Sequence, residues 1–94
     1  MKQLTLLIFT ALISFTAISE TVTGKVTDSN NKAVRNAAIF INGKFTYTDY
    51  YGKYRIRNIP KGTHQMRVEK NNTTIATSSV NVDNTKIVKD IKTQ

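Results

Sequence analysis

His64 is the only histidine in the chain, and its imidazole is the side chain best suited to acid–base or metal chemistry. Either role needs partners, and no second histidine, cysteine or cluster of carboxylates accompanies it in the sequence. His64 shares one face of an expected strand with Met66 and Val68, which is typical of a residue packed in the core or at its rim. The sequence therefore predicts no catalytic residue and no enzyme. A reaction that uses His64 is the alternative.

The acidic side chains do not indicate a metal site. Asp28 and Asp49 fall in expected turns, where aspartate commonly bonds backbone N–H groups, and Asp83 and Asp90 are isolated. Calcium needs a closely spaced acidic set, which the sequence lacks. There is no cysteine, which excludes disulfides, zinc–thiolate sites and thiol nucleophiles. We find no phosphate-binding glycine loop and no serine nucleophile motif, and we expect no metal and no cofactor.

Aromatic and basic residues concentrate between positions 44 and 57. Exposed tyrosine beside lysine and arginine stacks on sugars or flat ligands and pairs with anionic groups. Alternatively, Phe45 and Tyr47 are core residues, the next two tyrosines are turn residues, and the basic residues form a solvated strand face. The candidate ligand-binding surface consists of Tyr47, Tyr50, Tyr51, Lys53, Arg55 and Arg57, with Lys44 and Phe45 beside them.

The net charge of the chain is +8, from 14 basic and 6 acidic residues. Such a surface favours anionic partners, for example nucleic acid, acidic glycans, lipid headgroups or lipopolysaccharide. The basic residues are scattered along the chain, and simple solubility of a small domain explains this charge equally well.

Residues 1–19 have the layout of a cleavable export signal. Lys2 provides the positive start, residues 4–15 are uncharged and mostly apolar, and Ala17-Ile18-Ser19 offers small residues to the peptidase. A membrane-spanning helix needs about 20 apolar residues, more than this stretch has. An uncleaved anchor and an apolar N-terminal helix are the alternatives. We predict cleavage after Ser19, a folded domain over residues 20–94, and a secreted or periplasmic protein with no transmembrane segment after cleavage.

From Thr21 onward, apolar residues recur mostly at every second position, which predicts short β-strands and no helix. Asn42-Gly43 predicts a two-residue hairpin turn, and Asn71-Asn72 predicts a further turn. Residues 58–62 are expected to form a loop. About seven short strands joined by Gly, Asn and Asp turns indicate an all-β sandwich or small barrel. Expected strands cover residues 21–27, 36–42, 44–48, 53–57 and 63–69, then a weak strand at Ile75 followed by Val80 and Val82, and a last strand with Ile87, Val88 and Ile91.

Four blocks of sequence occur in an order that resembles a known family. They are VTGKVTD at 22–28, NAAI at 36–39, TDYYGKYRI at 48–56 and IPKGTH at 59–64. This pattern resembles the carboxypeptidase regulatory-like domain family over residues 21–91. The resemblance implies a seven-stranded Greek-key β-sandwich of the transthyretin-like (prealbumin-like) type, in a stand-alone exported member. The chain departs from the family pattern at His64, where tyrosine is usual, and at Asn71-Asn72, which replaces a glycine–aromatic pair.

The family pattern gives physical roles to residues at the start and middle of the chain. Gly24 lets a neighbouring group lie close against the first strand. Thr48 and Asp49 are expected to bond N–H groups of the turn that follows them, and Gly52 closes that turn.

Further roles follow in the fourth strand and beyond. Tyr54 and Ile56 are expected to fill the core, with the tyrosine hydroxyl reaching the rim. Pro60 and Gly62 shape the crossing from one sheet to the other. The edge of such a sandwich exposes unpaired backbone groups, which accept an extended peptide or a second copy unless basic residues guard against pairing.

By resemblance, such domains are rarely catalytic and brace a neighbouring domain or bind peptide or carbohydrate. We expect an exported, non-catalytic binding or accessory module whose partner is a protein, peptide or carbohydrate at the cell envelope or outside the cell. The alternative is a basic secreted protein that binds anionic surfaces such as lipopolysaccharide, lipid or nucleic acid, without specific nucleic-acid recognition. Another transthyretin-like family hydrolyses 5-hydroxyisourate with several histidines and a different C-terminus, so we reject that activity. Asn71 and Asn72 begin overlapping glycosylation sequons, which matter only in a eukaryote.

Overall fold

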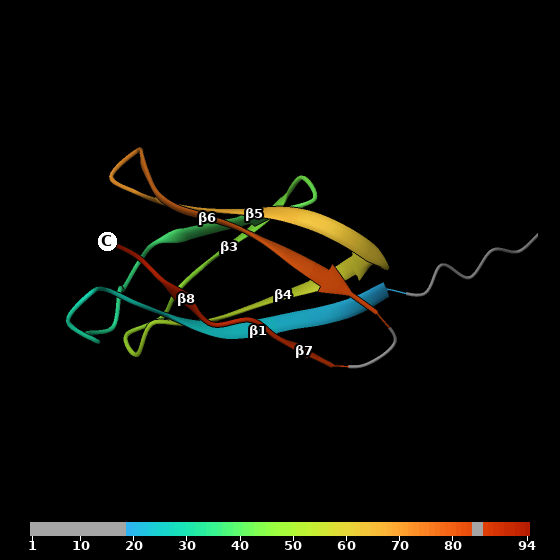
Figure 1. Cartoon of the computed structure of the whole chain (residues 1–94), viewed down its shortest axis with the longest axis horizontal. Helices are drawn as coiled ribbons and strands as arrows, with labels where there is room; N and C mark the ends of the chain where they lie inside the picture. The colour runs from blue at the N-terminus through green and yellow to red at the C-terminus, as the bar shows by residue number, and fades with distance from the viewer. Residues whose placement is uncertain (1–18, 84–85) are drawn as a thin grey trace, which may run out of the picture.

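The computed structural model describes residues 19–83 and 86–94, which form two β-sheets packed face to face (Figure 1). The expected export signal lies outside the described residues except for Ser19, where the first strand begins. Cleavage after Ser19 therefore stays a prediction. A cut there would leave all but the first residue of that strand in the folded domain.

The first sheet is built around β1 (Ser19–Thr27). β1 is antiparallel to β4 (Lys53–Pro60) and parallel to two short strands, β7 (Ile87–Val88) and β8 (Ile91–Lys92). β7 and β8 follow each other along the same side of β1, so together they are the expected last strand, interrupted at Lys89 and Asp90.

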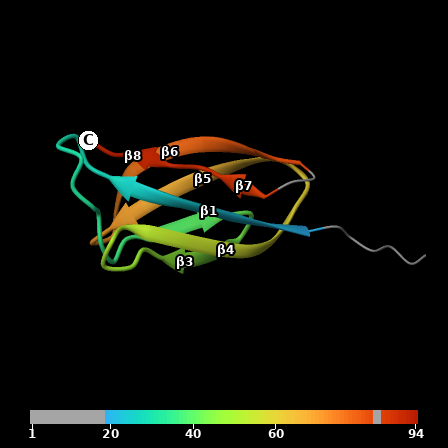
Figure 2. The ribbon, with the colours of Figure 1, turned by 90° about the horizontal axis from the view of Figure 1, so that it is seen from below.

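The second sheet is antiparallel, with the strand order β3-β2-β5-β6. The chain changes sheet at β1–β2, β3–β4, β4–β5 and β6–β7, which confirms the expected all-β Greek-key sandwich. β3 and β4 lie along one side of the sandwich, and β6, β7 and β8 along the opposite side (Figure 2). The strands of this sheet are β2 (Ala38–Ile41), β3 (Lys44–Tyr47), β5 (Gly62–Lys70) and β6 (Thr73–Val82).

Alternate residues of both sheets fill the space between them, as the period of two predicts. In β4 the inward side chains of Tyr54 and Ile56 are buried, while the alternate basic residues Lys53, Arg55 and Arg57 are exposed. Ala38 and Phe40 of β2 are half-buried, because neighbouring side chains also cover its outer face. The largest fully buried side chains are Val22, Val26, Ile39, Ile41, Ile59, Met66, Val68 and Val82.

The expected loop at residues 58–62 is wrong. β4 continues to Pro60 and β5 begins at Gly62, so only Lys61 separates the two strands at the crossing between sheets. The expected weak strand at Ile75 is also longer than predicted. It joins Val80 and Val82 in one strand of ten residues, β6.

A β-bulge in β4 explains why the sequence pattern suggested a loop. The register between β1 and β4 shifts here, so that Arg57 and Asn58 together face Thr21. Asn58 has a φ of 64°, in the left-handed region that asparagine tolerates better than most residues. The extra residue brings Ile56 and Ile59 to the same face, and both are buried in the core. Their spacing of three breaks the alternation from which strands are predicted.

Asparagine also forms the two hairpin turns that the sequence predicts. Asn42 and Gly43 have φ values of 52° and 76°, and Asn71 and Asn72 have values of 54° and 64°. Two successive residues at positive φ form a type I′ turn, whose twist matches that of the flanking strands. These turns join β2 to β3 and β5 to β6.

The expected close approach at Gly24 is confirmed. A Cβ atom at this position would lie 1.9 Å from the Lys89 carbonyl oxygen, so no larger residue fits without a shift of the last strand. The Tyr54 hydroxyl donates a hydrogen bond of 2.5 Å to that carbonyl. The Lys25 N–H is then bonded by a side chain, Asp90 Oδ1, at 2.9 Å. One carboxylate and one phenol thus satisfy the backbone groups at the interruption between β7 and β8.

Thr48 does not bond the following turn as expected. Its buried hydroxyl donates to the Val34 carbonyl at 2.8 Å and accepts the Ala37 N–H at 2.9 Å. These two hydrogen bonds hold the segment that leads into β2 against Thr48, which lies at the start of the connection from β3 to β4.

Asp49 forms the expected turn at this connection. Its Oδ1 accepts the N–H groups of Tyr51 and Lys53 at 2.8 and 2.9 Å. Asp28 makes the same arrangement two and four residues ahead in its own turn, at 2.8 and 3.0 Å. There, chiefly the hydrogen bond from the Lys32 N–H lowers the pKa of the Asp28 carboxyl.

Candidate binding groove along strands β3 and β4

A groove of about 720 Å³ crosses the outer face of the first sheet next to the edge of β3. β1 contributes Lys25, β4 contributes Lys53 and Arg55, and Lys86 closes the far end beside β7. Tyr47 of β3 forms part of the wall. Because outward residues alternate with core residues along β1 and β4, the strands hold these cations on one surface.

Two lysines of the groove lie directly opposite each other. Lys25 and Lys53 are cross-strand partners in the β1–β4 ladder, and both are exposed. Cβ atoms of such partners are about 5 Å apart, so two positive charges there repel each other. The only ion pair among the described residues joins Arg67 to Glu69, in the other sheet. No carboxylate therefore neutralises the lysine pair at ion-pair distance.

The two carboxylates of the groove are already engaged. Asp49 accepts the N–H groups of the turn before β4, and Asp90 accepts the Lys25 N–H. With four cations and two carboxylates, the groove keeps a formal charge of 4 − 2 = +2. This excess of positive charge attracts anions, and the two carboxylates of the groove remain bonded to backbone N–H groups.

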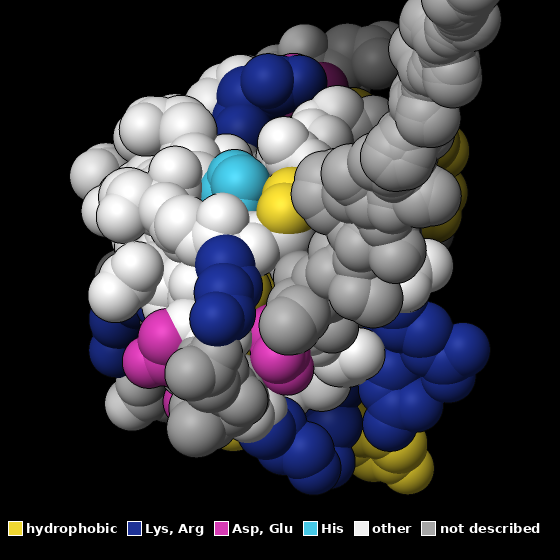
Figure 3. All heavy atoms as spheres, turned by 90° about the vertical axis from the view of Figure 1, so that its right-hand side faces the viewer, with side chains coloured by type: hydrophobic (Ala, Val, Ile, Leu, Met, Phe, Trp, Pro, Cys, Tyr) yellow, Lys and Arg dark blue, Asp and Glu magenta, His cyan; other side chains and the backbone are white. Residues whose placement is uncertain are grey.

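A second hollow of about 630 Å³ continues the groove along the seam between β3 and β4. It shares Thr46 and Arg55 with the first hollow and adds Lys44, Phe45 and Arg57. We call the two hollows together the basic groove. In the view onto the end of the sandwich, Lys and Arg side chains lie at the lower right and bottom, beside exposed hydrophobic side chains, and others lie at the top and centre (Figure 3). The cations of the basic groove are Lys25, Lys44, Lys53, Arg55, Arg57 and Lys86.

Phe45 and Tyr47 are not core residues, so this part of the alternative interpretation is wrong. They are 56% and 57% exposed and stack edge to face with centroids 5.6 Å apart. The ring centroids of Phe45 and Phe40 are 5.8 Å apart, and the Arg67 guanidinium lies 4.3 Å from the Phe40 ring centroid. The outer face of the second sheet thus carries an aromatic row that reaches the basic groove at β3.

Tyr50 and Tyr51 lie outside the groove. They occupy the turn between β3 and β4 as an edge-to-face pair with centroids 5.3 Å apart. The Arg35 guanidinium lies 3.9 Å from the Tyr50 ring centroid. Of the six residues predicted for the binding surface, the structure therefore gathers four at the groove and separates these two from it.

The sequence did not indicate two cations of the groove, Lys25 and Lys86. Both are far from residues 44–57 in the chain and join the groove only through the pairing of β1 with β4 and β7. Alternation along β1 already placed Lys25 on the outer face. Which strand would lie beside it is a property of the topology.

His64 is half-buried, and one ring nitrogen, Nε2, lies 2.7 Å from the Pro60 carbonyl oxygen. This position agrees with packing at the rim of the core. The histidine side chain is visible at the end of the sandwich, next to a hydrophobic side chain (Figure 3). In residues 19–83 and 86–94, no three His, Cys, Asp or Glu side chains come together as a metal site would require. The same residues contain no helix long and apolar enough to cross a membrane.

Comparison with known families matches residues 21–93 to the carboxypeptidase regulatory-like domain. Since the match spans most of the chain, this protein belongs to the carboxypeptidase regulatory-like domain family, as the sequence blocks indicated. The family is named for a regulatory-like domain, not for a catalytic one. No curated protein matches the chain.

A solved structure with a similar fold is that of the major pilin subunit of Bacillus cereus. The two chains superpose with a TM-score of 0.56 at 16% sequence identity. The superposed part covers 78% of this chain and 28% of the pilin chain, so this protein spans less than a third of the pilin. At this identity the likeness concerns the fold alone.

Proposed function

We propose that this protein is an exported, non-catalytic module that binds an acidic polysaccharide through the basic groove, at the cell envelope or outside the cell. The observation that carries the proposal is the lysine pair of β1 and β4. Lys25 and Lys53 face each other with no ion-pair partner among residues 19–83 and 86–94, and like charges directly opposite each other are destabilising. An anionic group bound between them removes that repulsion, so the pair favours the occupied groove.

The aromatic side chains of the groove narrow the ligand class. Phe45 and Tyr47 present exposed rings at the β3 wall, where sugar rings stack and hydroxyl groups reach the phenol. Six cations and two exposed aromatic rings line an open seam, not a closed cavity. That arrangement suits a chain with repeated anionic groups better than a single small molecule.

Several features support a role without catalysis. The His64 ring is bonded to a backbone carbonyl, and both groove carboxylates hold backbone N–H groups. The family description is that of a regulatory-like domain. The leader-like residues 1–19 and the similarity of the fold to that of a pilin subunit support a location at the envelope or beyond it.

Binding is measured by calorimetry with the purified protein and matched probes. Dextran sulfate and unmodified dextran share one backbone and differ in their sulfates, and polygalacturonate tests carboxylates. We expect binding to both acidic polymers, none to dextran, and a linear fall of log K with log salt concentration. Single-stranded oligo-dT and vesicles containing anionic lipid serve as competing classes. Tighter binding to either of these than to the acidic polysaccharides contradicts the proposal.

The variant Lys25→Gln/Lys53→Gln tests the groove itself. It removes the repelling pair, so we expect at least a tenfold loss of affinity together with an unchanged or increased free energy of unfolding. The control variant Lys32→Gln/Lys61→Gln removes two exposed lysines outside the groove and changes the net charge equally. We expect it to lose less than threefold. Equal losses in the two variants would show that net charge alone attracts the polymer.

A further inference from the structure

β6 is an edge strand without any charged residue. It pairs only with β5 in the second sheet, and its ten residues read TTIATSSVNV. Every other strand of eight or more residues among those described carries at least two charges. Proteins usually protect a long edge strand with lysine, proline or a covering segment, because its free N–H and C=O groups template pairing with another strand.

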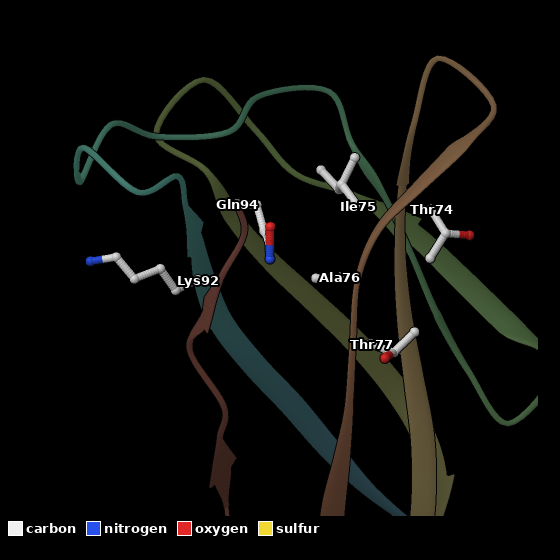
Figure 4. A pocket seen from close by; sticks show the side chains of 6 residues that line it. All are labelled: Thr74, Ile75, Ala76, Thr77, Lys92 and Gln94. Atoms are coloured by element: carbon white, nitrogen blue, oxygen red, sulfur yellow. The ribbon is translucent and has the colours of Figure 1, made fainter.

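A bulge limits the regular part of this edge to residues 76–82. This bulge places Ile75 out of register with β5, between the pairs Val68–Ala76 and Glu69–Thr74. A groove of about 640 Å³ lies beside residues 74–77 of β6, and its other wall is the C-terminal segment at Lys92 and Gln94 (Figure 4). From Ala76 onward, the register with β5 is regular to Val82.

We infer that β6 pairs with β6 of a second copy of this chain, antiparallel and centred on Ser79. In this register Ser79 faces its own symmetry mate, Thr77 faces Asn81, and Ala76 faces Val82. Antiparallel pairing across this centre keeps exposed residues opposite exposed residues and inward residues opposite inward residues. The second sheets of the two copies become one sheet of eight strands, with a twofold axis at Ser79.

The distribution of charge favours a second copy over other occupants. Two chains of net charge +8 repel each other at most surfaces. Four of the six cations of the basic groove lie on β3 and β4, on the side of the sandwich opposite β6, while Lys25 lies on β1 and Lys86 beside β7 (Figure 2). Pairing through β6 therefore joins the copies at an uncharged strand and leaves the groove cations of β3 and β4 toward the two outer ends. An acidic or basic peptide would gain no charge complementarity from β6.

Sedimentation velocity of the purified protein over roughly 10 μM to 1 mM tests this pairing, because a single strand edge is a small interface. We expect a concentration-dependent dimer. Ser79→Lys puts two positive charges opposite each other on the twofold axis and is expected to weaken association at least tenfold. Gln65→Lys is the matched control. Gln65 is the exposed β5 neighbour of Ser79, and in the dimer its two copies would lie roughly 14 Å apart.

Cysteine crosslinking locates the contact, because the natural chain has no cysteine. Directly opposed residues in an antiparallel pair have Cα atoms about 4.5–5.5 Å apart, within the range a disulfide spans. We expect Ser79→Cys to form a disulfide-linked dimer at least tenfold faster than Gln65→Cys under mild oxidation. Three results would each overturn the inference: a monomer up to 1 mM, equal weakening by the two lysine variants, or equal crosslinking at the two cysteine positions.

Discussion

At the residue scale, the absence of a Cβ atom at Gly24 allows the last strand to lie close against β1. The Lys89 carbonyl occupies the space that any larger residue would need. The buried Tyr54 hydroxyl satisfies that carbonyl, and Asp90 replaces it as acceptor for the Lys25 N–H. These residues act as a unit because a change in one leaves a backbone group of another without its partner.

Tyr54→Phe tests this unit and its dependence on pH. The pKa of Tyr54 is raised above its ordinary value of 10, first by burial and then by the charge of Asp90. Because the folded-state pKa is raised, the stabilising contribution of the neutral phenol is fully present below pH 10 and is lost as the pH rises above 10. At pH 7 we expect Tyr54→Phe to lower the free energy of unfolding by about 1–2 kcal/mol.

Urea denaturation of the wild type and the variant at pH 7, 9 and 11 measures this difference. The stability gap between them should be constant from pH 7 to 9 and should narrow at pH 11. The exposed Tyr50→Phe is the control, with no comparable gap at any pH. A Tyr54→Phe gap that stays the same at pH 11 would contradict the assigned role of burial.

At the element scale, the bulge in β4 sets which residues of its second half enter the core. Asn58 takes the left-handed conformation that lets Ile56 and Ile59 both point inward. Asn58→Val places a β-branched residue in that conformation, and we expect it to lower the free energy of unfolding by about 1–2 kcal/mol. Asn58→Gly removes the steric cost and should stay within about 0.5 kcal/mol of the wild type. Thermal unfolding of both variants provides the comparison, and equal effects would refute the conformational explanation.

Most strands could be predicted from the alternation of apolar residues, because the sandwich buries one face of each strand. The region from Asn58 to Gly62 could not, since a bulge places core residues three apart and a single residue then joins two strands. The sequence could predict the candidate site only where its residues lie close together in the chain. The sequence indicated Tyr47, Lys53 and Arg55, but Lys25 enters the groove through strand pairing across the chain.

The aromatic residues show the same limit. Phe45 and Tyr47 alternate as a strand should, but alternation does not say which of the two faces is inside. Tyr50 and Tyr51 follow only a few residues later, yet the Asp49 turn directs them away from the groove. One tight turn therefore separates aromatic residues that are close together in the sequence.

At the scale of the whole molecule, most cations of the basic groove and the uncharged edge strand lie on opposite sides of the sandwich. The basic groove follows β3 and β4, and the uncharged edge is β6 (Figure 2). In the paired sheet of eight strands, seven strand spacings separate the outer edges, or roughly 34 Å at 4.8 Å each. One long acidic polymer could then contact both grooves of a dimer.

The disulfide-linked Ser79→Cys dimer tests this consequence of the two proposals together. We expect it to bind long dextran sulfate at least tenfold more tightly, per protein chain, than the reduced protein at micromolar concentration. Sulfated fragments much shorter than roughly 34 Å cannot reach both grooves and should bind the two forms equally. Surface plasmon resonance with long and short sulfated chains provides the comparison. An equal gain for short fragments would show that the link changes the groove itself.

The last strand has a consequence for when the domain can form. β1, the first strand of the sandwich, has β7 and β8 as its partners on one side, and Thr93 near the end of the chain is buried and bonded to the Thr27 carbonyl. The pairing of β1 with β7 and β8 therefore needs both ends of the domain, and pairings between residues so far apart in the chain form slowly. Until residues 87–92 have been synthesised, β1 lacks its two partners on that side. In the exported protein that we propose, a sandwich still incomplete in this way is compatible with passage through a narrow translocation channel.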